Sequence, residues 1–373
     1  MGRSWVVAVL VGCSSKGFTP EETAVDTATE PSTTPETVVV EGCHATPRDA
    51  DDHALWLAFP YDAAGGPSDL WRSYAYDGAL TEVGDASFGR AWWGRGAWTP
   101  DGAFLFVVDD DGVVHGPANE LAAPYTSAVT VDRTGETAWL VNPNWADSGG
   151  GVYRASIDCE TGALGAPELV WTGKNTAAVV LRPGTASEAA IVTRELDGVP
   201  GQVHLVDLAT GDVFAHLDAF GDDEAIVSDA AWDYEGERLL VADYSAFSGV
   251  SNRVAVVTDA GPVDVIEVYD PVSLATAPWP DGSALVVSGY GNAVYELERT
   301  EDSYVLGAEV VSLDLPGVAV GVARGAQRGR VLVTENSGLW ELELLDGGGV
   351  VDHGRLLGGS GLTEIPGAIA LQP

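Results

Sequence analysis

Polar side chains recur at one position of this chain, where strongly apolar runs end. Six of them close such runs: Asp109, Asn142, Thr193, Asp243, Ser288 and Thr334. Just beyond the same runs lie Asp110, Asn144, Trp145, Arg194, Tyr244, Tyr290, Asn292, Glu335 and Asn336. An acidic run at 221–224 adds Asp223 and Glu224. If the apolar runs are strands whose ends meet, these side chains form one ligand-binding face.

Oxygen ligands that converge on one axis from several runs would bind a divalent cation. Ca²⁺ takes about six to eight oxygen ligands in proteins, and the residues that would supply them here are Asp109, Asn142, Asp243 and Glu335. The alternative is that these side chains satisfy backbone groups of their own turns. Both interpretations stay open, and no other cofactor is expected.

Other patterns that could carry chemistry are weak or absent. The sequence has no G-x-S-x-G nucleophile motif, no Walker loop and no C-x-x-C pair. GYGNAV at 289–294 lacks the third glycine of the dinucleotide fingerprint, and Asp109 to Gly112 lacks EF-hand spacing and predicts a hairpin turn. His204 and His216 are predicted to be packed or surface residues on adjacent strands of one sheet. We identify no catalytic residue.

The elements that must position these residues repeat along the chain. One strand leads through a turn into a second, strongly apolar strand, and GAWTPDGAFLFVVDD at 96–110 is the clearest copy. The turn glycines stand at 102, 135, 184, 236, 282 and 329, and four of the five intervals between them span 46 to 52 residues. Such a period is typical of a four-stranded propeller blade.

The two ends of the repetitive region predict how the blades close into a ring. IPGAIALQP at 365–373 reads as a first strand, and HALWLAFPYD at 53–62 reads as a second strand. The last segment should therefore supply the inner strand of the blade that begins near residue 53, which removes a free sheet edge. Counting second strands predicts a seven-bladed β-propeller whose second blade has a short outer part. The tryptophans at 98, 232 and 279 share one register and are predicted to pack between blades.

Two copies of a D-x-x-T-G turn, Asp158 to Gly162 and Asp207 to Gly211, carry a family resemblance. The stretch VHLVDLATGDVFAHL around the second copy resembles lactonase-like and quinoprotein-like propellers of the YVTN type. The resemblance implies the fold. It also implies an alternative function, a lactonase-like hydrolase with an axial divalent metal that polarises a carbonyl group. The chain departs from such enzymes because it has no recognisable axial histidine.

The first residues resemble the targeting sequence of a bacterial lipoprotein. Seven apolar residues at 5–11 are too few to span a bilayer, and they lead into Leu10-Val11-Gly12-Cys13, which resembles the lipobox. The resemblance implies a signal peptide at 1–12 and acyl chains on Cys13. Because Ser14 follows the cysteine, it also implies the outer membrane of a Gram-negative cell. Residues 13–42 are rich in Thr, Pro and Glu and predict a disordered tether, which leaves 43–373 for the propeller.

Cys43 and Cys159 remain once Cys13 carries lipid. In an oxidising compartment two remaining cysteines favour a disulfide, and two unrelated thiols are the alternative. Neither cysteine has a neighbouring His or Cys that would indicate catalysis or metal binding.

Composition and charge narrow the function classes. Apolar residues make up 46% of the chain, which excludes disorder of the whole protein. The formal net charge of −38 repels nucleic acid and anionic lipid. We expect a monomeric, lipid-anchored binding scaffold outside the cytoplasm, with an envelope protein or a glycan as its partner. The metal-dependent hydrolase is the alternative.

Overall fold

The computed structural model describes residues 41–46, 53–62, 64–92, 96–143, 150–194, 201–220, 226–243, 252–322, 327–358 and 366–372. The chain divides into two units, Met1–Thr37 and Val38–Pro373, and all described residues belong to the second. The predicted signal peptide, Cys13 and most of the predicted tether therefore lie outside the described residues. In the described part, no helix is long and apolar enough to cross a membrane.

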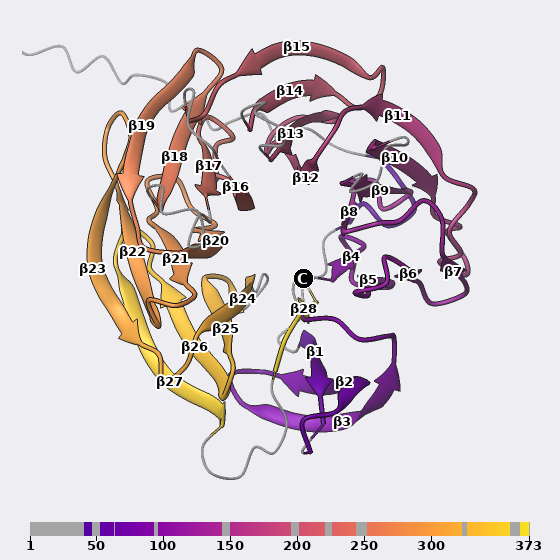
Figure 1. The fold of residues 1–373 in the computed structure, drawn as a ribbon, viewed down its shortest axis with the longest axis horizontal. Coiled ribbons are helices and arrows are strands. Elements are labelled where there is room, and N and C mark those ends of the chain that lie inside the picture. The colour runs from indigo at the N-terminus through magenta and orange to yellow at the C-terminus, as the bar shows by residue number, and fades with distance from the viewer. Residues whose placement is uncertain are drawn as a thin grey trace, which may run out of the picture. The chain divides into compact units, whose positions relative to one another are not determined.

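The second unit is a seven-bladed β-propeller, as the repeat predicts. It contains seven antiparallel four-stranded sheets, and Figure 1 shows them arranged around a ring in chain order. From the inner to the outer strand, blade 1 consists of β28 (Ile369–Leu371), β1 (His53–Tyr61), β2 (Pro67–Tyr76) and β3 (Leu80–Ser87). Blade 2 consists of β4 (Ala97–Trp98), β5 (Leu105–Val108), β6 (Val114–His115) and β7 (Glu120–Leu121). Its last two strands have two residues each, in line with the predicted short outer part.

The next two blades are regular. Blade 3 consists of β8 (Ala128–Val131), β9 (Thr137–Asn142), β10 (Gly151–Ser156) and β11 (Glu168–Thr172). Blade 4 consists of β12 (Thr176–Leu181), β13 (Glu188–Thr193), β14 (Val203–Asp207) and β15 (Asp212–Leu217).

The last three blades follow the same order. Blade 5 consists of β16 (Val227–Trp232), β17 (Leu239–Asp243), β18 (Arg253–Thr258) and β19 (Gly261–Glu267). Blade 6 consists of β20 (Pro271–Thr276), β21 (Ala284–Ser288), β22 (Ala293–Arg299) and β23 (Tyr304–Ser312). Blade 7 consists of β24 (Gly317–Val322), β25 (Arg330–Glu335), β26 (Gly338–Leu344) and β27 (Val350–Gly358).

The C-terminal strand closes the ring. β28 pairs antiparallel with β1, with Leu371 opposite Leu55 and Ile369 opposite Leu57. In Figure 1 the yellow β28 lies beside the indigo β1. This pairing confirms the closure predicted from the two ends of the repetitive region.

The hydrophobic core lies between blades. Seven buried clusters are found in the described residues, and each draws its members from two neighbouring blades. A second strand such as β21 is therefore buried along its whole length, because blades cover both of its faces. The outer strand β15 alternates between exposed and half-buried residues, because only one of its faces is covered.

Two of the three recurrent tryptophans pack as predicted. Trp232 of blade 5 donates a hydrogen bond from Nε1 to the carbonyl oxygen of Val180 in blade 4, at 3.1 Å. Trp279 of blade 6 packs against the cluster shared by blades 6 and 7.

The ring has two faces, which its connections define. We call the turn face the side that bears first-to-second and third-to-fourth strand turns, such as 99–104, 132–137 and 157–164. We call the loop face the side that bears second-to-third strand loops and crossovers between blades, such as 109–113, 268–270 and 289–292. Because strand direction alternates within each antiparallel sheet, the two kinds of connection lie at opposite ends of a blade.

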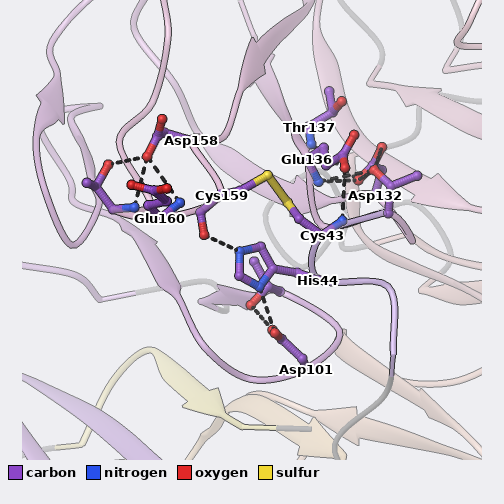
Figure 2. Close-up of a disulfide and its surroundings, with 12 residues drawn as sticks. Cys43, His44, Asp101, Asp132, Glu136, Thr137, Asp158, Cys159 and Glu160 are labelled. Carbon is purple, nitrogen blue, oxygen red and sulfur yellow. Dashed lines mark hydrogen bonds and ion pairs between the residues drawn. A yellow bond between two sulfur atoms is a disulfide. The ribbon is translucent and has the colours of Figure 1, made fainter. Parts of the chain in front are cut away.

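Residues 41–46 are fixed to the turn face. Cys43 forms a disulfide with Cys159, which lies in the turn between β10 and β11. The adjacent His44 is buried, and Figure 2 shows its ring between Asp101 and the backbone of Cys159. Its Nδ1 lies 2.6 Å from Oδ2 of Asp101 in blade 2, and its Nε2 lies 3.0 Å from the carbonyl oxygen of Cys159 in blade 3. The predicted disulfide is confirmed, and the chain enters the propeller at the turn face of blades 2 and 3.

Candidate ligand-binding face

Asp243, one of the four predicted metal ligands, is engaged inside its own blade. It is buried at the end of β17 and pairs across the sheet with Arg253, whose Nε lies 3.1 Å from Oδ2 of Asp243. Oδ1 of Asp243 accepts a hydrogen bond from the backbone N–H of Ile226 at 2.8 Å. The guanidinium of Arg253 also stacks over the ring of Phe220, 4.7 Å from its centroid.

Glu335 is engaged in the same way in blade 7. It is fully buried and accepts hydrogen bonds from Arg355 at 2.6 Å, from the hydroxyl of Ser337 at 2.9 Å and from the backbone N–H of Leu315 at 3.1 Å. The guanidinium of Arg355 also forms an ion pair with Asp314. A buried carboxylate with this many donors has little capacity left for a cation.

Asp109 closes the predicted hairpin turn of blade 2. Its Oδ1 accepts hydrogen bonds from the backbone N–H groups of Asp111 and Val113, at 3.0 and 2.8 Å. Its Oδ2 lies 2.9 Å from Nε2 of His115. The neighbouring Asp110 accepts hydrogen bonds from Arg90 at 2.8 Å and from the backbone N–H of Trp92 at 3.1 Å.

Among the described residues, Asp109, Asp243 and Glu335 belong to no group of three acidic, histidine or cysteine side chains whose ligand atoms gather. Asn142 is buried at the end of β9, where it pairs with Gly151 of β10. Among the described histidines, cysteines, aspartates and glutamates, the one group of three whose ligand atoms gather is Cys43, Glu136 and Cys159. Both sulfurs of that group are in the disulfide. The physical reason is local, because amides and arginines of each blade already bind its carboxylate.

The remaining predicted face residues divide into two groups. Arg194 donates a backbone hydrogen bond to the carbonyl oxygen of Asn175 at 2.8 Å, and burial lowers the pKa of its guanidinium. Asn336 follows β25, and its backbone N–H donates to Pro316. The others lie outside the described residues: Asn144, Trp145, Asp223, Glu224 and Tyr244.

Two exposed tyrosines mark a different site, on the loop face of blade 6. Tyr269 lies in the crossover before β20 and is 55% exposed, and Tyr290 lies in the loop between β21 and β22 and is 58% exposed. Leu315, on the following crossover, is exposed as well. We call Tyr269, Tyr290 and Asn292 the tyrosine site.

Asp270 holds the two halves of the tyrosine site together. It follows Tyr269 directly in the chain, has a positive φ of 52° and is fully buried. Its Oδ2 accepts a hydrogen bond from the backbone N–H of Tyr290. Its Oδ1 has no hydrogen-bond partner among the described residues, and burial raises the pKa of the carboxyl group. The buried carboxylate therefore fixes the position of one tyrosine relative to the other.

Two glycines let the loop approach this carboxylate. A Cβ atom added at Gly289 would lie 2.5 Å from Oδ2 of Asp270, and one added at Gly291 would meet the side chain of Ser288 and lie 3.3 Å from the ring of Tyr269. The loop 289–292 thus needs glycine at both positions in order to pack against Asp270 and Tyr269.

The sequence predicted two of the three residues of the tyrosine site. Tyr290 and Asn292 were predicted because they follow a second strand, a position that recurs in each blade. Tyr269 and Asp270 were missed because they lie in a crossover, where the repeat carries no signal. The usable signal was an aromatic residue followed by Asp-Pro at 269–271.

The comparisons with known proteins agree on fold and give no family. Neither a protein-family model nor a curated protein matches the sequence. A crystal structure of a protein from Lactobacillus plantarum is similar over 86% of this chain and 100% of its own, with 13% identity and a TM-score of 0.61. Sqt1 from Chaetomium thermophilum, bound to the N-terminus of the ribosomal protein L10, is similar over 80% of this chain and 88% of its own, with 13% identity and a TM-score of 0.54.

A putative 6-phosphogluconolactonase from Bacteroides uniformis is also similar, over 82% of this chain and 83% of its own, with 12% identity and a TM-score of 0.45. At 13% identity, the likeness to the Lactobacillus plantarum protein and to Sqt1 is one of fold alone.

Proposed function

We propose that this protein is a lipid-anchored binding scaffold outside the cytoplasm that holds a glycan on the tyrosine site of its loop face. The observation that carries the proposal is the pair of exposed tyrosines fixed on either side of the buried Asp270. Large aromatic side chains are more often buried than exposed, so two exposed rings on neighbouring loops favour a ligand that stacks on them.

The chemistry of the site favours a sugar. Tyrosine offers a flat apolar face and a hydroxyl group while losing little side-chain entropy on binding. Asn292, on the same loop as Tyr290, is half-buried, and its amide group can add a polar contact to a sugar that stacks on the tyrosines. The net charge of −38 disfavours acidic partners, so we propose a neutral or amino-substituted glycan.

The place where the chain enters the propeller supports the same proposal. The lipidated Cys13 would be joined through the tether to Cys43, which is fixed to the turn face. The loop face is the opposite side of the ring, so the tyrosine site would point away from the point of attachment. A scaffold that must meet a partner in the envelope benefits from that orientation.

A glycan array probed with the mature chain tests the proposed ligand class. We expect binding to neutral or amino sugars that falls at least tenfold in Tyr269→Ala and in Tyr290→Ala. Tyr234→Ala is the matched control, because Tyr234 is an exposed tyrosine on the turn face. Equal binding by all four proteins would refute the tyrosine site, and binding to an envelope protein with no glycan signal would replace the glycan by a protein partner.

The anchor has a separate test. Cells grown with an alkyne-labelled fatty acid should incorporate it into the wild-type chain and not into Cys13→Ser. Labelling of the serine variant would contradict the predicted lipid anchor and leave the tyrosine site untouched.

A further inference from the structure

Two histidines meet on the outer part of blade 4. His204 of β14 lies directly opposite His216 of β15 in the strand register, which confirms that they occupy adjacent strands of one sheet. Their Nδ1 atoms are 2.7 Å apart, and the two rings are nearly perpendicular, at 86°. A hydrogen bond between two imidazole nitrogens needs one nitrogen without a proton, so at least one lone pair already points at this spot.

The surroundings of the pair hold one ring and leave the other accessible. His204 is 8% exposed, and its ring packs 5.1 Å from that of Trp171 on β11 of blade 3. His216 is exposed to solvent. A fixed imidazole beside an accessible one allows a small ion to enter from solvent without disturbing the core.

The pairing of the rings and the charge of the chain both suit a cation. One nitrogen of the pair carries no proton in the hydrogen bond between the rings, and an unprotonated imidazole nitrogen is the form that binds metal ions. The net charge of −38 raises the local concentration of divalent cations around the molecule.

The spacing of the nitrogens selects a coordination geometry. Imidazole nitrogens bind divalent metals at about 2.0–2.1 Å, which gives two neighbouring nitrogens a separation of about 2.9 Å at a right angle and about 3.3 Å at the tetrahedral angle. The observed 2.7 Å is closer to the right-angled arrangement. Square-planar and tetragonal sites with nitrogen ligands are typical of Cu²⁺ and Ni²⁺, and Cu²⁺ binds most tightly of the divalent series.

We propose that His204 and His216 form a two-imidazole Cu²⁺ site on the rim of blade 4. Within the described residues, no third His, Cys, Asp or Glu gathers with them. Water or an added ligand therefore completes the coordination. Both rings bind through Nδ1, and the ring that donates the shared hydrogen bond moves its proton from Nδ1 to Nε2, so no net proton is released.

The test is a titration of the mature chain with CuSO₄, followed by calorimetry and by electron paramagnetic resonance. We expect one Cu²⁺ per chain at this site, with couplings to two imidazole nitrogens, and at least tenfold weaker binding by His216→Asn. The matched control is His353→Asn, because His353 is another partly exposed histidine on an outer strand, 2.8 Å from Glu343. That control should bind Cu²⁺ as the wild type does.

The His216→Asn variant should fold as the wild type does, because His216 is exposed and its replacement removes no buried group. Quenching of Trp171 fluorescence by Cu²⁺ gives a second readout, and the Trp171→Phe variant should lose that part of the quenching. The proposal is overturned if His216→Asn binds Cu²⁺ as tightly as the wild type, or if Zn²⁺ displaces Cu²⁺ at equal concentration. Neither outcome affects glycan binding, so this site and the tyrosine site stand or fall separately.

Discussion

On the turn face, several half-buried or exposed aspartates close the turns of their own blade, whereas three carboxylates of the loop face are fully buried, either against arginines or without a full set of partners. Asp132 accepts hydrogen bonds from the backbone N–H groups of Glu136 and Thr137, both at 3.2 Å. Asp158 accepts one from the backbone N–H of Thr161 at 2.9 Å. On the loop face, Asp243 and Glu335 pair with arginines and Asp270 keeps one free oxygen.

This difference indicates what each face does. Turns in which an Asp side chain accepts hydrogen bonds from backbone N–H groups recur on this face and stabilise the ring. They look alike because every blade must reverse its chain between antiparallel strands in the same way. The loop-face carboxylates differ from blade to blade, and in blade 6 Asp270 joins the backbone segments that carry two exposed tyrosines. Asp109 is the exception on the loop face, because the short blade 2 closes there with an ordinary turn.

The largest effect is expected on the turn face. Replacing Cys43 and Cys159 by serine should lower the free energy of unfolding by about 2–5 kcal/mol, because the disulfide links residues 116 positions apart and restricts the unfolded chain. Urea unfolding measures the loss. Glycan binding should be unchanged, since the tyrosine site lies on the other face.

Dithiothreitol is the control for this change. It should destabilise the wild type to the level of the double variant and leave the double variant unaffected. Loss of glycan binding in the double variant would show that the two faces are coupled and would break the comparison.

A smaller effect is expected on the loop face. Gly289→Ala should lower the free energy of unfolding by about 1–3 kcal/mol, because the new methyl group would press on Asp270. It should also weaken glycan binding, because the loop that carries Tyr290 must move. Gly84→Ala in β3 is the matched control, since its Cβ would meet no atom closer than 3.9 Å and its effect should be small. Thermal unfolding and the glycan array together read out both changes.

The contributions of Asp270 and Asp158 to the free energy of unfolding should change with pH in opposite directions. Burial raises the pKa of Asp270, so the folded state binds this proton more tightly than the unfolded state, and the wild type loses stability as pH rises from 3.8 through the raised pKa. Asp270→Asn removes that loss and should gain stability relative to the wild type at pH 7, with the gain shrinking below pH 4.

Asp158, in a turn-face turn, should show the reverse. Hydrogen bonds from Thr161 lower the pKa of its carboxyl group, so its contribution is present above pH 3.8 and is lost as pH falls through the lowered pKa. Asp158→Asn should therefore be less stable than the wild type at pH 7 and approach it in acid. Melting temperatures of the two variants and the wild type between pH 3 and pH 7 measure both effects. If both variants shifted in the same direction at pH 7, the proposed difference between the loop-face and turn-face aspartates would be contradicted.

The smallest expected signal comes from Ca²⁺. Each described candidate ligand already has partners in its own blade, so calorimetric titration should give no heat above dilution. Hydrolysis of a lactone panel should likewise be insensitive to EDTA. Metal-dependent turnover would instead support the hydrolase alternative and would place a catalytic centre on the loop face.

The fold could be predicted because its causes are local and repeated. Turn glycines recur at six positions, mostly 46 to 52 residues apart, and an apolar second strand such as β21 recurs in each of the seven blades. The tyrosine site could be predicted only in part, because the repeat fixes where Tyr290 and Asn292 begin and says nothing about crossovers. The orientation of the carboxylate side chains on the loop face also could not be predicted from the sequence. The carboxylate of Asp243 could point toward the axis of the ring or toward Arg253. Which of the two it does depends on side chains that meet only after the sheet has formed.

The pairing of β28 with β1 has a consequence for how the protein is made. The first sheet to leave the ribosome lacks its innermost strand, and that strand is encoded in the last few residues. Until the segment that forms β28 has been synthesised, blade 1 has an open edge on which other chains could assemble. The ring can therefore close only after residues 369–371 have left the ribosome.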